Sequence, residues 1–175
     1  MEYSNNELLD FKRVAVSLGL CGEYKKKWDG CVSPHELMDV ALDANGVEFM
    51  ADSFSFGWGM SKEFVMGRFA DYINGRYVRN KDGYTSEMYV GYKGDIRIRS
   101  TITLIAGCDT RIIVPPHFVG RLYVCGNSNV SVTGEGNIDV YSYGDNEIIT
   151  SSRYAVSVAC KRIDSSVWAD GCGHK

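Results

Sequence analysis

The sequence predicts an α+β fold in which an N-terminal helical lobe packs on a C-terminal all-β stack. Up to about residue 80, apolar residues recur at helical spacing. From about residue 84, short runs of β-branched and aromatic residues are separated by glycine, asparagine or aspartate. We therefore divide the chain into a helical lobe, residues 1–80, and a β-rich lobe, residues 84–175, which together form one cooperative unit.

Three or four helices are predicted in the N-terminal lobe. The clearest start signal has Ser33 as N-cap, Pro34 at the first helical position and Glu36 to complete a capping box. Ser61 is a second good N-cap. Apolar periodicity and the Gly and Asn stop signals give the approximate bounds: 8–18, 34–45, 47–56 and 62–73.

The β-rich lobe contains eight short runs that we predict to be strands. In order they are MYVGY, IRIRSTITLI, RIIV, RLYV, VSV, IDVYSY, EII and AVSV. The second run alternates polar and apolar residues, with a slip at residues 100–101. Its apolar members are expected to share one buried face: Ile96, Ile98, Ile102 and Leu104.

The spacing of these runs favours a short β-solenoid-like stack. Their centres lie eight to ten residues apart, and two intervals make about 17 residues. Cys108 and Cys125 are 17 residues apart, as are Asn129 and Asn146, which is expected when successive rungs stack. The prediction places Cys108, Cys125 and Cys160 in one column, with the helices covering the first rung. An antiparallel meander with tight hairpins is the alternative, because it gives the same interval without stacking.

Composition and charge restrict the function classes. The chain has a net charge of −3, which argues against a surface built wholly for nucleic acid. No apolar run approaches the roughly 18 residues of a membrane helix, and the acidic, polar N-terminus lacks the apolar core of a signal peptide. We therefore expect a cytoplasmic protein that does not enter a membrane. Its six cysteines are then expected to be reduced, although their even number also fits disulfides.

Two motifs that could bind a cofactor or a metal have better structural explanations. TGEG at residues 133–136 is followed by strand-like residues, and no lysine lies between Lys93 and Lys161, so it is expected to be a corner and not a phosphate loop. Cys21, Cys31 and His35 lack the short spacing of structural zinc ligands. The terminal Cys-Gly-His is weak evidence for a site. We predict no cofactor and no metal.

Catalytic motifs are also missing. The sequence contains neither G-x-S-x-G nor H-E-x-x-H. His117 follows two prolines and is expected to be a surface turn residue, in a turn where a cis peptide is possible. No pair of carboxylates is singled out among the acidic residues. We therefore predict no catalytic residue, and a hydrolase-type enzyme is only the third hypothesis.

A basic middle segment supports a nucleic-acid-binding alternative. Residues 56–99 hold eight lysines and arginines against five acidic residues, and the helix with its following turn resembles the second helix of a helix-turn-helix. The competing interpretation is that the apolar side of this helix packs on the β-rich lobe while the cations are solvated. The candidate phosphate contacts are Lys62, Arg68, Arg76, Arg79, Lys81, Arg97 and Arg99.

Tyrosines supply the candidate protein-binding residues. The chain has eleven, and tyrosine suits recognition surfaces because it joins an apolar ring to a polar tip. Tyr141 and Tyr143 should point the same way from one strand, either lining a core or facing a partner. With Glu135 and Asp139 they are our partner-facing candidates.

The stretch from residue 57 to residue 92, with GWGMSKEF, YINGRYV and GYTSEMYVGY, resembles small proteins of gut Bacteroides and of their phages or mobile elements. The resemblance extends through the β-rich lobe, and no activity, cofactor or catalytic residue comes with it. It implies an accessory protein of the cytoplasm, encoded by a phage or mobile element. Our leading hypothesis is thus a non-catalytic protein-interaction or assembly module, which binds a protein partner or associates with itself.

Overall fold

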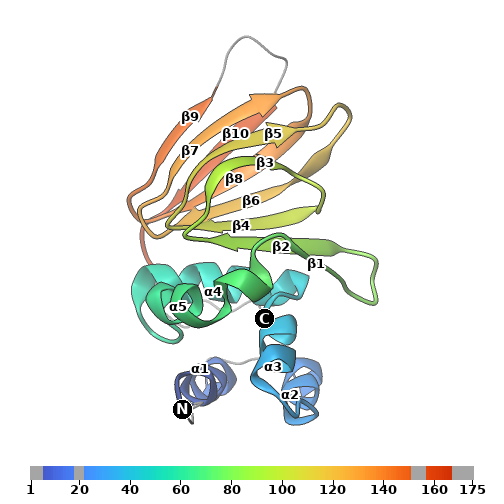
Figure 1. Ribbon diagram of the computed structural model, residues 1–175, viewed down its shortest axis with the longest axis vertical. Helices are drawn as coiled ribbons and strands as arrows, with labels where there is room; N and C mark the ends of the chain where they lie inside the picture. Colours follow the sequence, from blue (N-terminus) through green and yellow to red (C-terminus); the bar gives the residue numbers. More distant parts are fainter. Residues whose placement is uncertain (1–5, 18–21, 151–156, 167–175) are drawn as a thin grey trace.

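The computed structural model describes residues 6–17, 22–150 and 157–166, and it confirms the α+β prediction (Figure 1). Within these ranges five helices precede ten strands. The helices are α1 (Asn6–Ser17), α2 (Gly22–Asp29), α3 (Pro34–Ala41), α4 (Ala44–Phe56) and α5 (Lys62–Ile73). The strands are β1 (Arg76–Arg79), β2 (Thr85–Val90), β3 (Lys93–Arg97), β4 (Ile102–Ala106), β5 (Asp109–Val114), β6 (Val119–Cys125), β7 (Asn129–Gly134), β8 (Asn137–Tyr143), β9 (Glu147–Thr150) and β10 (Ser157–Ile163).

The strands form a two-sheet β-solenoid. From β2 onward, the chain alternates between a six-stranded sheet, ordered β1-β2-β4-β6-β8-β10, and a four-stranded sheet, ordered β3-β5-β7-β9. All neighbours from β2 to β10 pair in parallel, with partners such as Lys93 and Asp109, or Asp109 and Asn129. The solenoid prediction is therefore confirmed, and the antiparallel meander is wrong.

The first coil is closed by a strand that the sequence analysis did not predict. β1 pairs antiparallel with β2, from Arg76 opposite Met88 to Arg79 opposite Thr85. The basic residues of this segment predict a turn at the end of the helical lobe, and this prediction is wrong. The pairing covers the edge of β2, which would otherwise expose a row of unpaired backbone groups.

Helix starts follow the predicted capping chemistry. The Ser33 hydroxyl accepts a hydrogen bond from the amide of Glu36 at 3.2 Å, and the Glu36 carboxylate reaches back to the amide of Val32 at 2.6 Å. The Ser61 hydroxyl caps α5 in the same way, at 3.1 Å from the amide of Phe64. The predicted end of the second helix at residues 45–46 is wrong, because α3 ends at Ala41 and α4 begins at Ala44.

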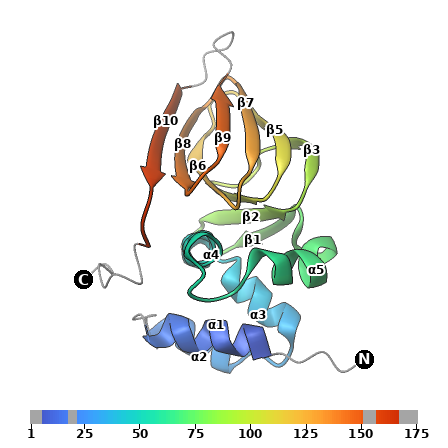
Figure 2. The same ribbon diagram turned by 90° about the vertical axis from the view of Figure 1, so that its left-hand side faces the viewer.

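The six-stranded sheet packs on both faces, and its strands β2 and β4 are buried along their whole length. One face looks into the solenoid, where side chains such as Ile105, Leu122 and Val140 pack against the four-stranded sheet. The other face packs under the helices: α5 contacts β2, and α4 contacts β2, β4, β6 and β8. Figure 2 shows α4 and α5 directly below β1 and β2, with α1 and α2 farthest from the stack. The helices therefore cover the first coil, as expected, and α4 also extends along the sheet.

The predicted common face of IRIRSTITL is wrong. Ile96 and Ile98 belong to the core inside the solenoid, whereas Ile102 and Leu104 belong to the core under the helices. The predicted slip at residues 100–101 is the corner between β3 and β4, where the chain passes from one sheet to the other. The alternation of polar and apolar residues thus continues across two strands that lie in different sheets.

A column of glycines marks one corner of the solenoid. Gly91, Gly107, Gly126 and Gly144 directly follow β2, β4, β6 and β8, and each has φ between 61° and 69°. This left-handed backbone is strained for most other residues. Each coil therefore leaves the six-stranded sheet through the same glycine conformation.

A second column at this corner links neighbouring coils through side chains. The amide of Tyr92 donates to Cys108 Sγ at 3.3 Å, the amide of Cys108 to Ser128 Oγ at 3.1 Å, and the amide of Ser128 to Asn146 Oδ1 at 2.9 Å. In each case a side chain of one coil accepts a hydrogen bond from a backbone amide of the preceding coil. We call Cys108, Ser128 and Asn146 the corner ladder.

The predicted cysteine column is wrong. Cys125 pairs with Ala106, and Cys160 pairs with Val140, so the two cysteines lie in different columns from each other and from Cys108. The step of 17 residues from Cys108 to Cys125 is close to the length of a coil but does not follow its local register.

The longest helix in the described ranges, α4, has 13 residues. Crossing a bilayer takes roughly 20 apolar residues, so no helix in this part of the chain could span a membrane.

Candidate functional site

The end of the solenoid opposite to β1 is the first candidate interaction site. β10 pairs with β8 along all of its seven residues, from Ser157 to Ile163. No other strand among the described residues pairs with β10. The side chains from Ala159 to Arg162 are exposed. We call β9 and β10 the open end of the solenoid.

The edge of β10 has few of the features that block strand pairing. It contains neither proline nor glycine, and its register with β8 runs without a bulge. Two cations lie on it, Lys161 and Arg162. Arg162 forms ion pairs with Asp145 at 3.1 Å and with Asp164, so acidic neighbours compensate part of this charge.

The strand β10 extends further than the sequence predicts. The last predicted run, AVSV, covers residues 155–158, of which 155–156 lie outside the described residues. The signal that was available is the continued alternation in SVACKRI, where Val158, Cys160 and Arg162 share one side of the strand.

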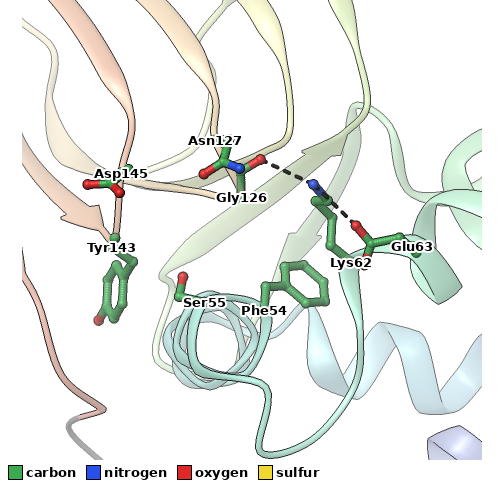
Figure 3. A pocket seen from close by; sticks show the side chains of 9 residues that line it. Phe54, Ser55, Lys62, Glu63, Gly126, Asn127, Tyr143 and Asp145 are labelled. Carbon is green, nitrogen blue, oxygen red and sulfur yellow. Dashed lines mark hydrogen bonds and ion pairs between the residues drawn. The ribbon is translucent and has the colours of Figure 1, made fainter.

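A pocket of about 360 Å³ is the second candidate site (Figure 3). It lies between the end of α4, the start of α5 and two neighbouring corners of the solenoid. Its lining residues are Phe54, Ser55, Lys62, Glu63, Gly126, Asn127, Tyr143, Gly144 and Asp145.

The polar groups of this pocket are largely engaged in holding the fold. Lys62 Nζ donates to the carbonyl of Gly126 at 3.2 Å and forms an ion pair with Glu63 at 3.3 Å. A hydrogen bond from its own backbone amide, together with Lys62, lowers the pKa of Glu63, so this carboxylate is charged at neutral pH. Ser55 donates to the carbonyl of Ala51 at 2.8 Å. The described lining residues therefore provide no nucleophile paired with a base.

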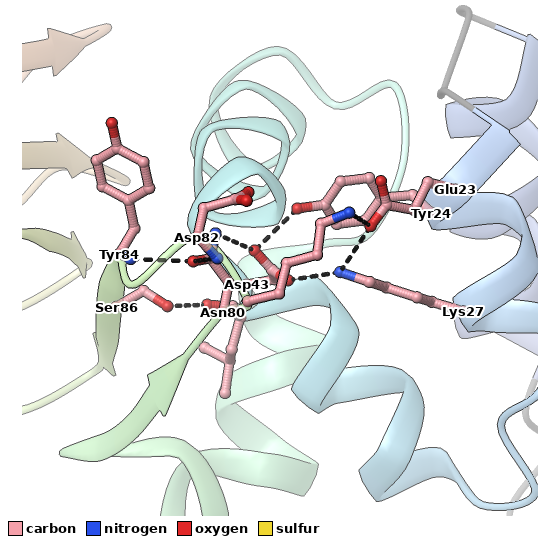
Figure 4. Close-up of polar contacts among 10 residues, drawn as sticks. Glu23, Tyr24, Lys27, Asp43, Asn80, Asp82, Tyr84 and Ser86 are labelled. Carbon is pink, nitrogen blue, oxygen red and sulfur yellow. Dashed lines mark hydrogen bonds and ion pairs between the residues drawn. The ribbon is translucent and has the colours of Figure 1, made fainter.

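A polar cluster ties the β1–β2 hairpin to the helices (Figure 4). Buried Asp43, just before α4, accepts hydrogen bonds from Tyr24 at 2.8 Å and from Lys27 at 2.9 Å. Lys81, in the hairpin turn, forms an ion pair with Glu23 at 2.6 Å, which lowers the pKa of Glu23. The cluster holds α2, the α3–α4 junction and the hairpin together, and Lys81 is part of it.

Several of the predicted phosphate contacts are bound to acidic side chains. Arg76 donates to both carboxylate oxygens of Asp39, at 2.6 and 2.8 Å, and lies over the ring of Tyr72. Arg99 donates to Glu87 at 3.2 Å. Together with Lys62 and Lys81, these two arginines make contacts within the protein.

Two predicted phosphate contacts, Arg79 and Arg97, have no ion pair to an acid in the described part of the chain. Arg68 lies over the ring of Phe64, with its guanidinium carbon 5.0 Å from the ring centroid. Arg79 and Arg97 are exposed, on β1 and β3 respectively. The structure thus places the seven residues on α5, β1, the hairpin turn, β3 and the corner after β3, and does not gather them into one cationic surface.

One partner-facing candidate is wrong. Tyr143 is 2% exposed and belongs to the core under the helices. Tyr141 points to the same side, as predicted, but is half-buried and stacks on Tyr123 with ring centroids 5.1 Å apart. Glu135 and Asp139 are exposed. Asp139 and Tyr141 lie on β8, the strand beside β10.

The remaining motifs are corners or dispersed residues. TGEG spans the end of β7 and the turn to β8, and a Cβ at Gly134 would lie 2.0 Å from the carbonyl oxygen of Val114. His117 is exposed, in a turn with φ of 61°, and no cis peptide is present among the described residues. Cys31, Cys108, Cys125 and Cys160 are free thiols. Cys21, Cys172 and His174 lie outside the described residues.

No group of three or more His, Cys, Asp or Glu in the described part of the chain is arranged to hold a metal ion.

Comparisons of the chain with protein-family models, with curated proteins and with solved structures found no match.

Proposed function

We propose that this protein is a non-catalytic interaction or assembly module that uses the open end of its solenoid. The free edge of β10 carries this proposal, since it offers seven consecutive residues that no other described strand pairs with. Exposed strand edges present unpaired N–H and C=O groups, and other chains bind to them by adding a strand. The partner-facing candidates Asp139 and Tyr141 lie on the neighbouring strand and can extend such a contact.

The arrangement of charges supports this proposal over nucleic-acid binding. Arg76, Lys81 and Arg99 bind acidic side chains at 2.6 to 3.2 Å. A DNA duplex would have to compete with these acidic side chains for the cations. Phosphate binding requires several cations that lie together on one surface.

The cellular context is part of the same proposal. We infer an accessory protein of a phage or mobile element that acts in the cytoplasm. The resemblance of residues 57–92, described above, supports this origin. A small module that presents a strand edge fits an accessory role, because it can add to an assembly without chemistry of its own.

Light scattering across a wide concentration range tests the proposal. A mass that rises with concentration, or a stable complex with an added protein or strand-forming peptide, is the expected result. A strict monomer that binds neither would contradict it.

The nucleic-acid alternative needs a separate test with variants that spare the fold. Arg76 is a poor choice, because its loss also breaks the contact with Asp39. We recommend Arg79→Ala combined with Arg97→Ala, since both side chains are exposed. If the alternative were correct, binding to random duplex DNA would weaken steeply with salt, and the double variant would flatten that dependence.

A further inference from the structure

We propose that the partner at the open end is a second copy of this chain, joined by antiparallel pairing of two β10 strands around a two-fold axis at Cys160. This inference rests on the proposed function and specifies its partner. Cys160 is the central residue of β10, with three residues on either side. An edge that pairs with itself around its centre gives a closed dimer.

The first argument is that the two ends of the solenoid differ. At the first coil, β1 pairs antiparallel with β2 and occupies the edge of the six-stranded sheet. α5 packs against β2 at the same end. The first coil thus ends in a four-residue antiparallel strand, whereas the last coil ends in the seven-residue parallel strand β10. The longer edge offers more backbone groups for pairing, and contact between two identical ends is isologous.

The second argument is the charge pattern of the strand. With Cys160 on the axis, Lys161 lies opposite Ala159 of the second copy, and Arg162 lies opposite Val158. No like charges then face one another directly, which is a requirement for stable antiparallel pairs. A register centred on Lys161 would place two lysines face to face. Asp145 and Asp164 already compensate Arg162.

The third argument is that the inner apolar residues of the last coil are incompletely buried. Ile148 on β9 and Val158 on β10 pack against the core inside the solenoid, but both are only partly buried. Inner residues of earlier coils, such as Val130 and Val140, are completely buried. The strands of a second copy would extend the sheet over this end and remove further apolar surface from water.

The native cysteine provides a direct test of the register. Directly opposite residues in an antiparallel pair have Cβ atoms about 4.5–5.5 Å apart, a separation from which a small adjustment allows a disulfide. We would treat the full chain with Cu(II)-phenanthroline, which accepts one electron from each of two thiolates as the S–S bond forms. Peptide mapping should identify a Cys160–Cys160 link in a covalent dimer.

Two substitutions at the same position separate pairing from cross-linking. Cys160→Ser should keep the dimeric mass in light scattering and lose the cross-link. Cys160→Arg should be monomeric, because two bulky cations would meet on the axis. The side chain at this position is exposed, so both variants should keep the circular dichroism spectrum of the wild type.

The outcomes distinguish this inference from the proposed function. A dimer that persists in Cys160→Arg, or cross-links that avoid Cys160, would overturn the β10 pairing and leave an assembly module with another interface. A wild-type monomer that pairs with a foreign strand would also overturn it, while supporting the module. A monomer that binds nothing would overturn both.

Discussion

Arg99 Nη2 donates to the carboxylate of Glu87 at 3.2 Å, and Glu87 is completely buried in the first coil. The other carboxylate oxygen accepts the backbone amide of Arg99 at 3.0 Å. Glu87→Ala would leave these donors without their acceptor and should lower the free energy of unfolding by about 3 kcal/mol. Urea denaturation would measure the change. Glu135→Ala, at an exposed corner, is the control and should change stability by less than about 0.5 kcal/mol.

The corner ladder predicts a cost for removing one hydroxyl. Ser128→Ala would leave the amide of Cys108 without its acceptor in a buried position, and should destabilise the protein by about 1–3 kcal/mol. Ser131→Ala, on the outer side of β7, the strand that follows Ser128, should have little effect. Equal effects of the two substitutions in thermal unfolding would contradict a structural role for the ladder.

Alanine substitutions at two glycines with positive φ distinguish the cost of backbone strain from the cost of a steric clash. A Cβ at Gly144 meets nothing within 4 Å, so Gly144→Ala should cost only the strain of its conformation, about 1–2 kcal/mol. At Gly134 the Cβ would also collide with the backbone of Val114 at 2.0 Å. Gly134→Ala should therefore destabilise by more than about 4 kcal/mol or prevent folding. Comparable unfolding midpoints for the two variants would show that the corner is looser than described.

Stability should fall in alkaline solution. Burial, together with the negative charge of Glu48, raises the pKa of Tyr123 to about 12, against about 10 for an exposed tyrosine. The folded state thus disfavours the ionised phenol. The contribution of the neutral phenol to the free energy of unfolding is complete below pH 10 and is lost between pH 10 and 12, by about 2 kcal/mol. Urea denaturation at increasing pH would show the decline.

Tyr123→Phe provides the control for this pH dependence. It should make the decline shallower without abolishing it, because burial also raises the pKa of Tyr89 to about 12 and that of Cys125 to about 12. An unchanged slope in Tyr123→Phe would show that Tyr123 ionises normally in the folded protein.

Local sequence signals predicted the elements that depend on local chemistry. Ser33 and Ser61 cap helices because a hydroxyl needs only the next turn of backbone to act. The segment forming α2 was missed, since only Tyr24 and Trp28 are buried in it and two apolar residues set no clear period. β1 was missed because its pairing with β2, a tertiary contact, makes RYVR a strand.

The solenoid could be predicted from spacing, whereas its register could not. Coils differ by a few residues at their corners, so a fixed step from Cys108 reaches Cys125, although the structural equivalent of Cys108 in the next coil is Ser128. The repeated glycine after Val90, Ala106, Cys125 and Tyr143 was the better signal.

The candidate site depended on information that the sequence does not contain. Arg76 and Asp39 are 37 residues apart, and nothing in either segment indicates that they bind each other. The cations that lie close together in the sequence therefore predict a larger cationic surface than the folded protein presents. The burial of Tyr143 likewise depends on where α4 lies across the sheet.

The glycine column makes a coil an exchangeable unit. Gly91, Gly107, Gly126 and Gly144 hold the backbone in one conformation at the same corner of successive coils. A segment that runs from one of these glycines to the next begins and ends with the same geometry, so its duplication or loss leaves both neighbouring junctions unchanged. Evolution, or an engineer, can therefore lengthen this protein one turn at a time, provided that α4 keeps its contacts with β2, β4, β6 and β8.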